Sequence, residues 1–176
     1  MGGLEVTPVG WLFALAGLAC LGRPDRLAAM LVATVTFSAT AVVNVPAVPF
    51  GFQPYHLFGT LLVASVAVRE GTRLAARLTL LGLDTALLGA FILWGLISTA
   101  AAGFPGVAVA HMAHVAFGAL AMTALRVLAV RPREMSLLVS SLVVGVAFSA
   151  VWGFVQALLH VVGLEYPAWV FNNSVG

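Results

Sequence analysis

Two of the four histidines in this sequence, His111 and His114, have a spacing that brings side chains together on a helix. Residues three apart lie on one helical face, so the two imidazole rings can converge. Such a pair could ligate a metal ion or a haem iron, with His160 as a further ligand. The alternative is that the rings hydrogen-bond to the backbone, to lipid headgroups or to each other. Because the chain has a single cysteine, Cys20, and no His-Glu-x-x-His motif, we predict neither a metal site nor a cofactor.

Two ionisable residues, Asp84 and Arg126, interrupt otherwise apolar segments. An unpaired charge inside a membrane is costly, and both residues would lie roughly 6–9 Å below the same interface at 1.5 Å per residue. We therefore predict an ion pair between Asp84 and Arg126 on neighbouring helices. Two alternatives stay open. Arg126 could extend alone to the headgroups beside a neutral or hydrated Asp84, or Asp84 could relay protons.

The composition defines the kind of protein that holds these residues. Of the 176 residues, 62% are apolar and 8% are charged, and the mean hydropathy is +1.11. Ordinary soluble domains are about 45–50% apolar and about 25% charged. A soluble enzyme, a nucleic-acid-binding protein and a disordered chain are therefore excluded, and an integral membrane protein is predicted.

The apolar segments predict an all-α, polytopic membrane protein with about six transmembrane helices in one domain, residues 1–163. The predicted helices cover residues 8–22, 27–45, 51–68, 78–102, 107–130 and 135–163. Each approaches the roughly 20 apolar residues that a spanning helix needs, and the first is the shortest. Residues 164–176 are predicted to form an outward-facing tail. If the sequence is a piece of a longer protein, the truncation point is expected in this tail.

The arginines predict the orientation of these helices. All eight basic residues are arginines, and they fall in three alternate loops or at the helix ends beside them: Arg23, Arg26, Arg69, Arg73, Arg77, Arg126, Arg131 and Arg133. The positive-inside rule makes that side cytoplasmic and places both termini outside. The four histidines then lie toward the outer leaflet, and any site is expected to open outward. Arginine-only basic residues and many alanines suggest a bacterial inner-membrane protein.

The last predicted helix carries small residues at every fourth position. They are Ser141, Gly145, Ser149, Gly153 and Ala157, which form a small-residue strip. Lipid supplies no hydrophobic drive between helices, so close packing in a membrane depends on small residues. The strip predicts a tight contact with another helix, either in this chain or in a second copy.

Two stretches of the sequence resemble a known family. They are TFSATAVVNV at residues 36–45, followed by PFGFQPYH at residues 49–56, and LEYPAWVFNNS at residues 164–174. Both resemble the N-terminal half of the bacterial O-antigen ligase and O-antigen polymerase family. The resemblance implies a membrane glycosyltransferase of polysaccharide biosynthesis. Such proteins act at the outer face of the inner membrane on glycans linked to undecaprenyl diphosphate, without a metal.

The family's catalytic arginines and histidine lie in outer loops of its later portion. Because the arginines of this chain are assigned to the cytoplasmic side, no catalytic residue is transferred and enzymatic activity stays undecided. The resemblance suggests that Asn44, Gln53, Tyr55 and His56 bind sugar hydroxyls. Alternatively, they cap the two helices around a Pro-rich turn.

The sequence leaves three functions open. The first is the N-terminal portion of a glycan ligase or polymerase. The second is a non-catalytic six-helix membrane protein that packs with partners through the small-residue strip. The third is a membrane protein that binds haem or a metal ion through His111, His114 and His160. Expected partners are membrane lipid, a lipid-linked glycan and a packing helix, and nucleic acid is not among them.

Overall fold

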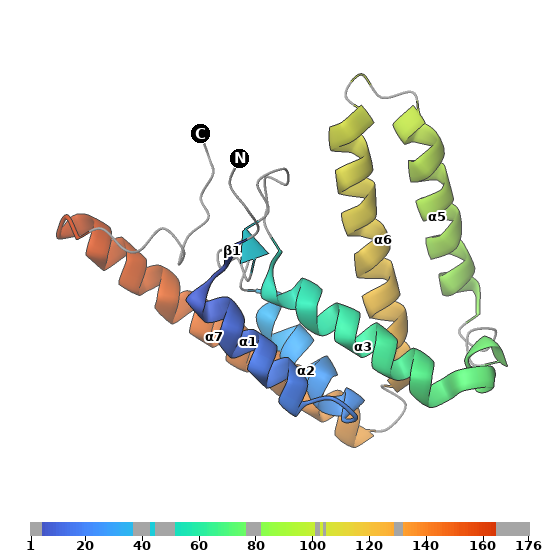
Figure 1. The fold of residues 1–176 in the computed structure, drawn as a ribbon, viewed down its shortest axis with the longest axis horizontal. Helices are drawn as coiled ribbons and strands as arrows, with labels where there is room; N and C mark the ends of the chain where they lie inside the picture. Colours follow the sequence, from blue (N-terminus) through green and yellow to red (C-terminus); the bar gives the residue numbers. More distant parts are fainter. Residues whose placement is uncertain are drawn as a thin grey trace.

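The computed structural model describes residues 5–36, 43–44, 52–76, 82–100, 103, 105–128 and 132–164 (Figure 1). Within these ranges the protein forms six α-helices, which confirms the all-α class. They are α1 (Pro8–Ala19), α2 (Pro24–Thr34), α3 (Pro54–Glu70), α5 (Leu83–Ala100), α6 (Pro105–Leu128) and α7 (Pro132–Val161). A short 3-10 helix, η1 (Gly71–Arg73), follows α3. Two short strands, β1 (Glu5–Val6) and β2 (Val43–Asn44), pair antiparallel.

Proline opens most of these helices. Pro8, Pro24, Pro54, Pro105 and Pro132 are the first residues of α1, α2, α3, α6 and α7. Proline is favoured there because its missing N–H would have no partner within the helix and its fixed φ suits the helix. At α1, the hydroxyl of Thr7 also accepts a hydrogen bond of 2.9 Å from the backbone N–H of Gly10.

The predicted helix 27–45 is wrong, because α2 ends at Thr34 and residues 43–44 form a strand. The Thr34 hydroxyl bonds back to the carbonyl oxygens of Met30 and Leu31, at 2.7 and 3.2 Å. Such bonds compete with the helical pattern, and the β-branched residues here suit extended backbone. At 1.5 Å per residue, α1 and α2 are about 18 and 16 Å long, short of a roughly 30 Å hydrocarbon layer. The later predicted ranges agree with α3, α5, α6 and α7 to within about five residues at each end.

Two helices of the described chain are long and apolar enough to cross a membrane. They are α6, over His111–Leu128, and α7, over Pro132–Val161. Two further segments, Pro8–Ala19 and Thr85–Thr99, are apolar but shorter. Length and composition thus support association with a membrane.

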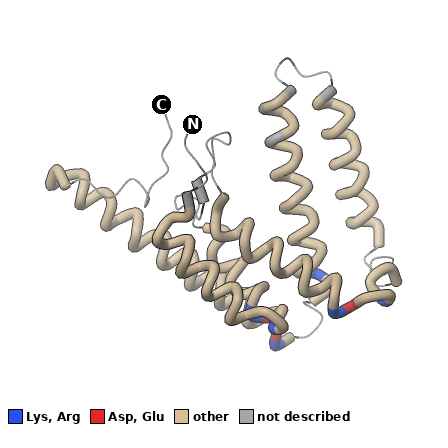
Figure 2. Tube along the Cα trace, in the orientation of Figure 1, with Lys and Arg blue, Asp and Glu red and all other residues tan. Residues whose placement is uncertain are grey.

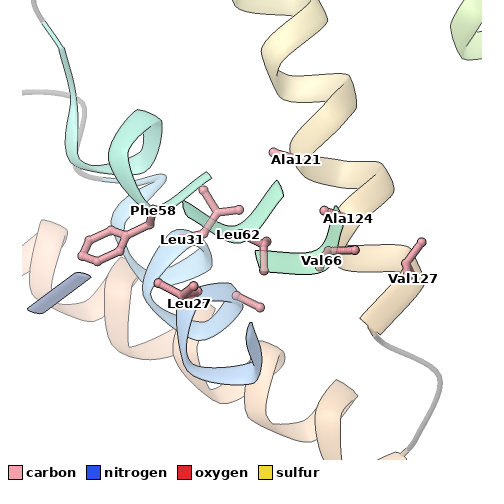
Figure 3. Packing of buried hydrophobic residues seen from close by; sticks show 9 residues of the cluster. Leu27, Leu31, Phe58, Leu62, Val66, Ala121, Ala124 and Val127 are labelled. Carbon is pink, nitrogen blue, oxygen red and sulfur yellow. The ribbon is translucent and has the colours of Figure 1, made fainter. Parts of the chain in front are cut away.

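The core lies where α3 crosses the other helices. Leu27 and Leu31 of α2 meet Phe58, Leu62 and Val66 of α3, as Figure 3 shows. On the other side of α3, the partners from α6 are Ala121, Ala124 and Val127. Small residues there let two backbones approach closely. In Figure 1, α3 runs between the α5–α6 hairpin and the group formed by α1, α2 and α7.

The small-residue strip lies on α7, and from here on we call it the α7 strip; it meets α2 at its middle. A Cβ atom at Gly145 would collide with the backbone oxygen of Ala33. One turn later, the Ser149 hydroxyl lies 3.0 Å from the Thr36 hydroxyl and 3.2 Å from the Thr36 carbonyl oxygen. Toward the C-terminus, Gly153 has no described atom within 4 Å of its Cβ position, and Ala157 is exposed. Among the described residues, the middle of the strip therefore packs against α2, and its C-terminal part has no helix packed on it.

The charged side chains that the structure describes gather at one edge of the molecule. Figure 2 shows them at the α1–α2 turn, at the ends of α3 and α6 and at the start of α7. Six arginines lie in these segments: Arg23, Arg26, Arg69, Arg73, Arg126 and Arg133. Arg77 and Arg131 lie outside the described residues. We call this side of the molecule the charged edge.

Candidate functional site

Three polar aromatic side chains meet where α3 begins beside α6. Tyr55 and His56 lie in the first turn of α3, and His114 lies in the middle of α6. The Tyr55 hydroxyl is 2.6 Å from Nε2 of His114, and Nε2 of His56 is 3.3 Å from Nδ1 of His114. We call these three residues the histidine cluster.

A backbone donor assigns the direction of the hydrogen bonds in the cluster. The backbone N–H of Gln53 donates to Nδ1 of His56 at 3.0 Å, so this nitrogen is an acceptor. A neutral His56 then carries its proton on Nε2 and donates to Nδ1 of His114. His114 in turn carries its proton on Nε2 and donates to the Tyr55 oxygen. This series of hydrogen bonds therefore ends at Tyr55, whose hydroxyl proton can be donated to a further acceptor.

Aromatic rings hold His56 in this orientation. Phe52 stacks on its ring with centroids 5.3 Å apart, and Phe117 of α6 lies at 5.2 Å. Gly59, one turn after Tyr55, leaves the space that the Phe117 ring occupies, since a Cβ atom at this position would collide with it. The packing of α3 on α6 thus fixes the geometry of the cluster.

The structure brings together only some of the residues that the sequence suggested as substrate-facing. Tyr55 and His56 are half-buried and in contact, and Gln53 is buried beside them. Asn44 pairs through its backbone with Glu5 across the two strands, and its side chain lies outside the described part. The sequence reasoning missed His114 as their partner. The signal available was that it shares the depth of His56 in the predicted orientation.

The structure does not bring together the three histidines considered as metal ligands, His111, His114 and His160. His160 lies in the last turn of α7, and Figure 1 shows this end of α7 well apart from α6, which carries His111 and His114. No group of three or more metal-ligating side chains is present among the described residues. His114 instead bonds to residues of α3.

The histidine cluster lies far from the charged edge on both helices that form it. His56 and Arg69 are thirteen residues apart on α3, or about 20 Å along the helix. His114 and Arg126 are twelve residues apart on α6, or about 18 Å. Two helices therefore independently give the same separation between the polar cluster and the arginines.

The predicted Asp84–Arg126 pair stays a prediction, because the Asp84 side chain lies outside the described part. The packing of α5 on α6 does give the relative height of the two residues. Gly95 of α5 touches Met112 of the antiparallel α6. Because the two helices run in opposite directions, the eleven residues back from Gly95 to Asp84 on α5 match the eleven residues forward from Met112 to Thr123 on α6. Asp84 therefore lies level with Thr123. Asp84 is thus about one turn from the height of Arg126.

Comparison with protein-family profiles, with curated proteins and with solved structures finds no match for this chain.

Proposed function

We propose that this chain is a polytopic protein of the bacterial inner membrane, with the charged edge in the cytoplasm and both termini outside. Two helices with the length and composition of spans support this proposal, as does the collection of arginines at one edge. The large apolar side chains that α5 and α7 expose suit contact with lipid tails; examples are Leu93 and Trp94 on α5 and Phe154 on α7.

In this orientation, the histidine cluster would bind the glycan of an undecaprenyl-diphosphate-linked donor near the outer leaflet. The observation that carries this proposal is the series of hydrogen bonds that passes through the exposed His114 and ends in the hydroxyl of the half-buried Tyr55. Sugars present hydroxyl groups that accept such a bond, and aromatic rings offer apolar faces beside it. The resemblance of residues 36–56 to the O-antigen ligase and polymerase family favours a glycan over other polar ligands. The proposed role is binding and positioning, because no catalytic residue is assigned.

The Tyr55→Phe variant tests this function directly. We expect it to weaken binding of undecaprenyl-diphosphate-linked N-acetylglucosamine to the protein in nanodiscs by about tenfold, because one hydrogen bond is lost while the ring remains. His114→Ala should act in the same direction. The matched control is His160→Ala, which removes an exposed imidazole outside the cluster. Unchanged binding in Tyr55→Phe, or equal losses in both histidine variants, would contradict the proposal.

A second candidate function is a non-catalytic protein that packs with a partner helix. The observation favouring it is the C-terminal half of the α7 strip, where no described atom lies within 4 Å of the Cβ position of Gly153 and Ala157 is exposed. In this case the purified protein would bind no lipid-linked glycan and would associate through α7.

A further inference from the structure

A cavity of about 750 Å³ opens at the charged edge, where four helix ends meet. The start of α2, the first nine residues of α7 and the last turns of α3 and α6 form its walls. Pockets that hold small organic ligands measure about 300–1,000 Å³. The cavity is separate from the histidine cluster, since Arg69 in its wall is about 20 Å from His56 along α3.

Three arginines from three different helices line this cavity. They are Arg26 of α2, Arg69 of α3 and Arg133 of α7. In the part of the chain that the structure describes, none of the three forms an ion pair. The two carboxylates of the lining, Asp25 and Glu134, lie in the first turns of α2 and α7, where the helix dipole stabilises negative charge.

The sum of these charges favours an anion. Three guanidiniums and two carboxylates leave a net side-chain charge of +1, and the N-termini of α2 and α7 add positive potential. Arg23, the N-cap of α2, makes no side-chain cap hydrogen bond. Two hydroxyl donors, Ser136 and Ser140, lie one turn apart on α7 in the same wall.

We propose that this cavity binds a phosphate group. The planar guanidinium fork matches phosphate oxygens and can donate two parallel hydrogen bonds to them. Three arginines approaching from separate helices can surround one tetrahedral anion, which a single helix could not do. This chemistry is shared by the headgroup of an anionic lipid and by a free phosphate.

The remaining wall of the cavity is apolar and favours the lipid as the source of the phosphate. Ala28, Leu128, Leu137 and Leu138 line it beside the charged groups. Glycerol and the first methylene groups of an acyl chain would pack on these side chains while the phosphate meets the arginines. Basic pockets between helices on the cytoplasmic side are suited to anionic headgroups.

Native mass spectrometry of the full chain in detergent, titrated with dioleoylphosphatidylglycerol, tests this proposal. We expect one tightly bound lipid per chain and much weaker binding of dioleoylglycerol, which has the same acyl chains without phosphate. At about fivefold per arginine, the double variant R26Q/R133Q should bind the phospholipid about 25-fold more weakly. The matched control is Arg73→Gln, an exposed arginine of η1 outside the cavity, which should leave the affinity unchanged.

Competition with inorganic phosphate separates the two sources of the anion. Binding of the phospholipid that millimolar phosphate does not displace assigns the cavity to a lipid headgroup. If phosphate displaces the phospholipid and also binds to the wild type but not to R26Q/R133Q, the cavity is assigned to a free phosphate. Either assignment, to a lipid headgroup or to a free phosphate, supports the proposal. Equal binding of dioleoylglycerol and phosphatidylglycerol to the wild type overturns it without need of any variant. Equal affinities of R26Q/R133Q and Arg73→Gln, or binding of neither probe, also overturn it.

Discussion

Replacing Phe58 by Ala is expected to lower the free energy of unfolding by about 3 kcal/mol. Phe58 is 0% exposed at the centre of the core and packs edge-on against Phe13 with ring centroids 5.9 Å apart. Removal of its ring leaves a cavity between α1, α2 and α3 that rigid helices fill poorly. In a lipid-like surrounding the lost packing contributes most of this effect, because lipid tails solvate an unburied ring well. Unfolding in mixed micelles with sodium dodecyl sulfate, followed by circular dichroism, measures the change.

The matched control for this prediction is Phe91→Ala on α5. Phe91 is 59% exposed, so its ring makes fewer contacts within the protein. We expect this variant to change the free energy of unfolding by about 0.5 kcal/mol or less. Equal losses in the two variants would show that α3 does not occupy the core as described.

Replacing Gly145 by Ala is expected to destabilise the protein by about 2 kcal/mol, although Ala is the better helix former. The new methyl group would collide with the backbone oxygen of Ala33. A side chain could rotate away from such a contact, whereas a backbone atom moves only with its helix. Helix α2 would therefore shift away from α7 and weaken the bond between Ser149 and Thr36.

The same substitution at Gly153 is the control, since it lies two turns further along the same strip. No described atom is within 4 Å of the added methyl group there. Gly153→Ala should therefore be neutral or stabilising by up to about 1 kcal/mol, through helix propensity alone. The measurement is the same mixed-micelle unfolding. A Gly145→Ala variant as stable as Gly153→Ala would contradict the α2–α7 contact.

Hydrophobic runs predicted the four longer helices because an uninterrupted apolar segment of that length has few other structures available. They failed at residues 27–45, where an apolar run contains a short helix and then a strand. Periodicity alone does not separate these cases. The hydroxyl of Thr34 bonds to α2's own backbone, and the pairing of Val43 and Asn44 depends on residues almost forty positions earlier.

The candidate site was predicted in part, for a similar reason. Tyr55 and His56 are neighbours in the sequence, so their proximity follows from the start of α3. Their contact with His114 depends on how α3 crosses α6, which Gly59 and the alanines of α6 determine. The cavity at the charged edge combines arginines from three helices, and one-dimensional spacing does not show which of them share a wall.

We propose that the chain crosses the membrane with its charged edge in the cytoplasm. Cysteine labelling tests it most directly, in a Cys20→Ser background that removes the one native thiol. Thr72→Cys places an exposed cysteine in η1 at the charged edge, and Gly106→Cys places one in the exposed first turn of α6, at its opposite end. In spheroplasts, a membrane-impermeant maleimide should label Gly106→Cys and leave Thr72→Cys unlabelled until the membrane is permeabilised. Labelling of both before permeabilisation, or of Thr72→Cys alone, would contradict this orientation.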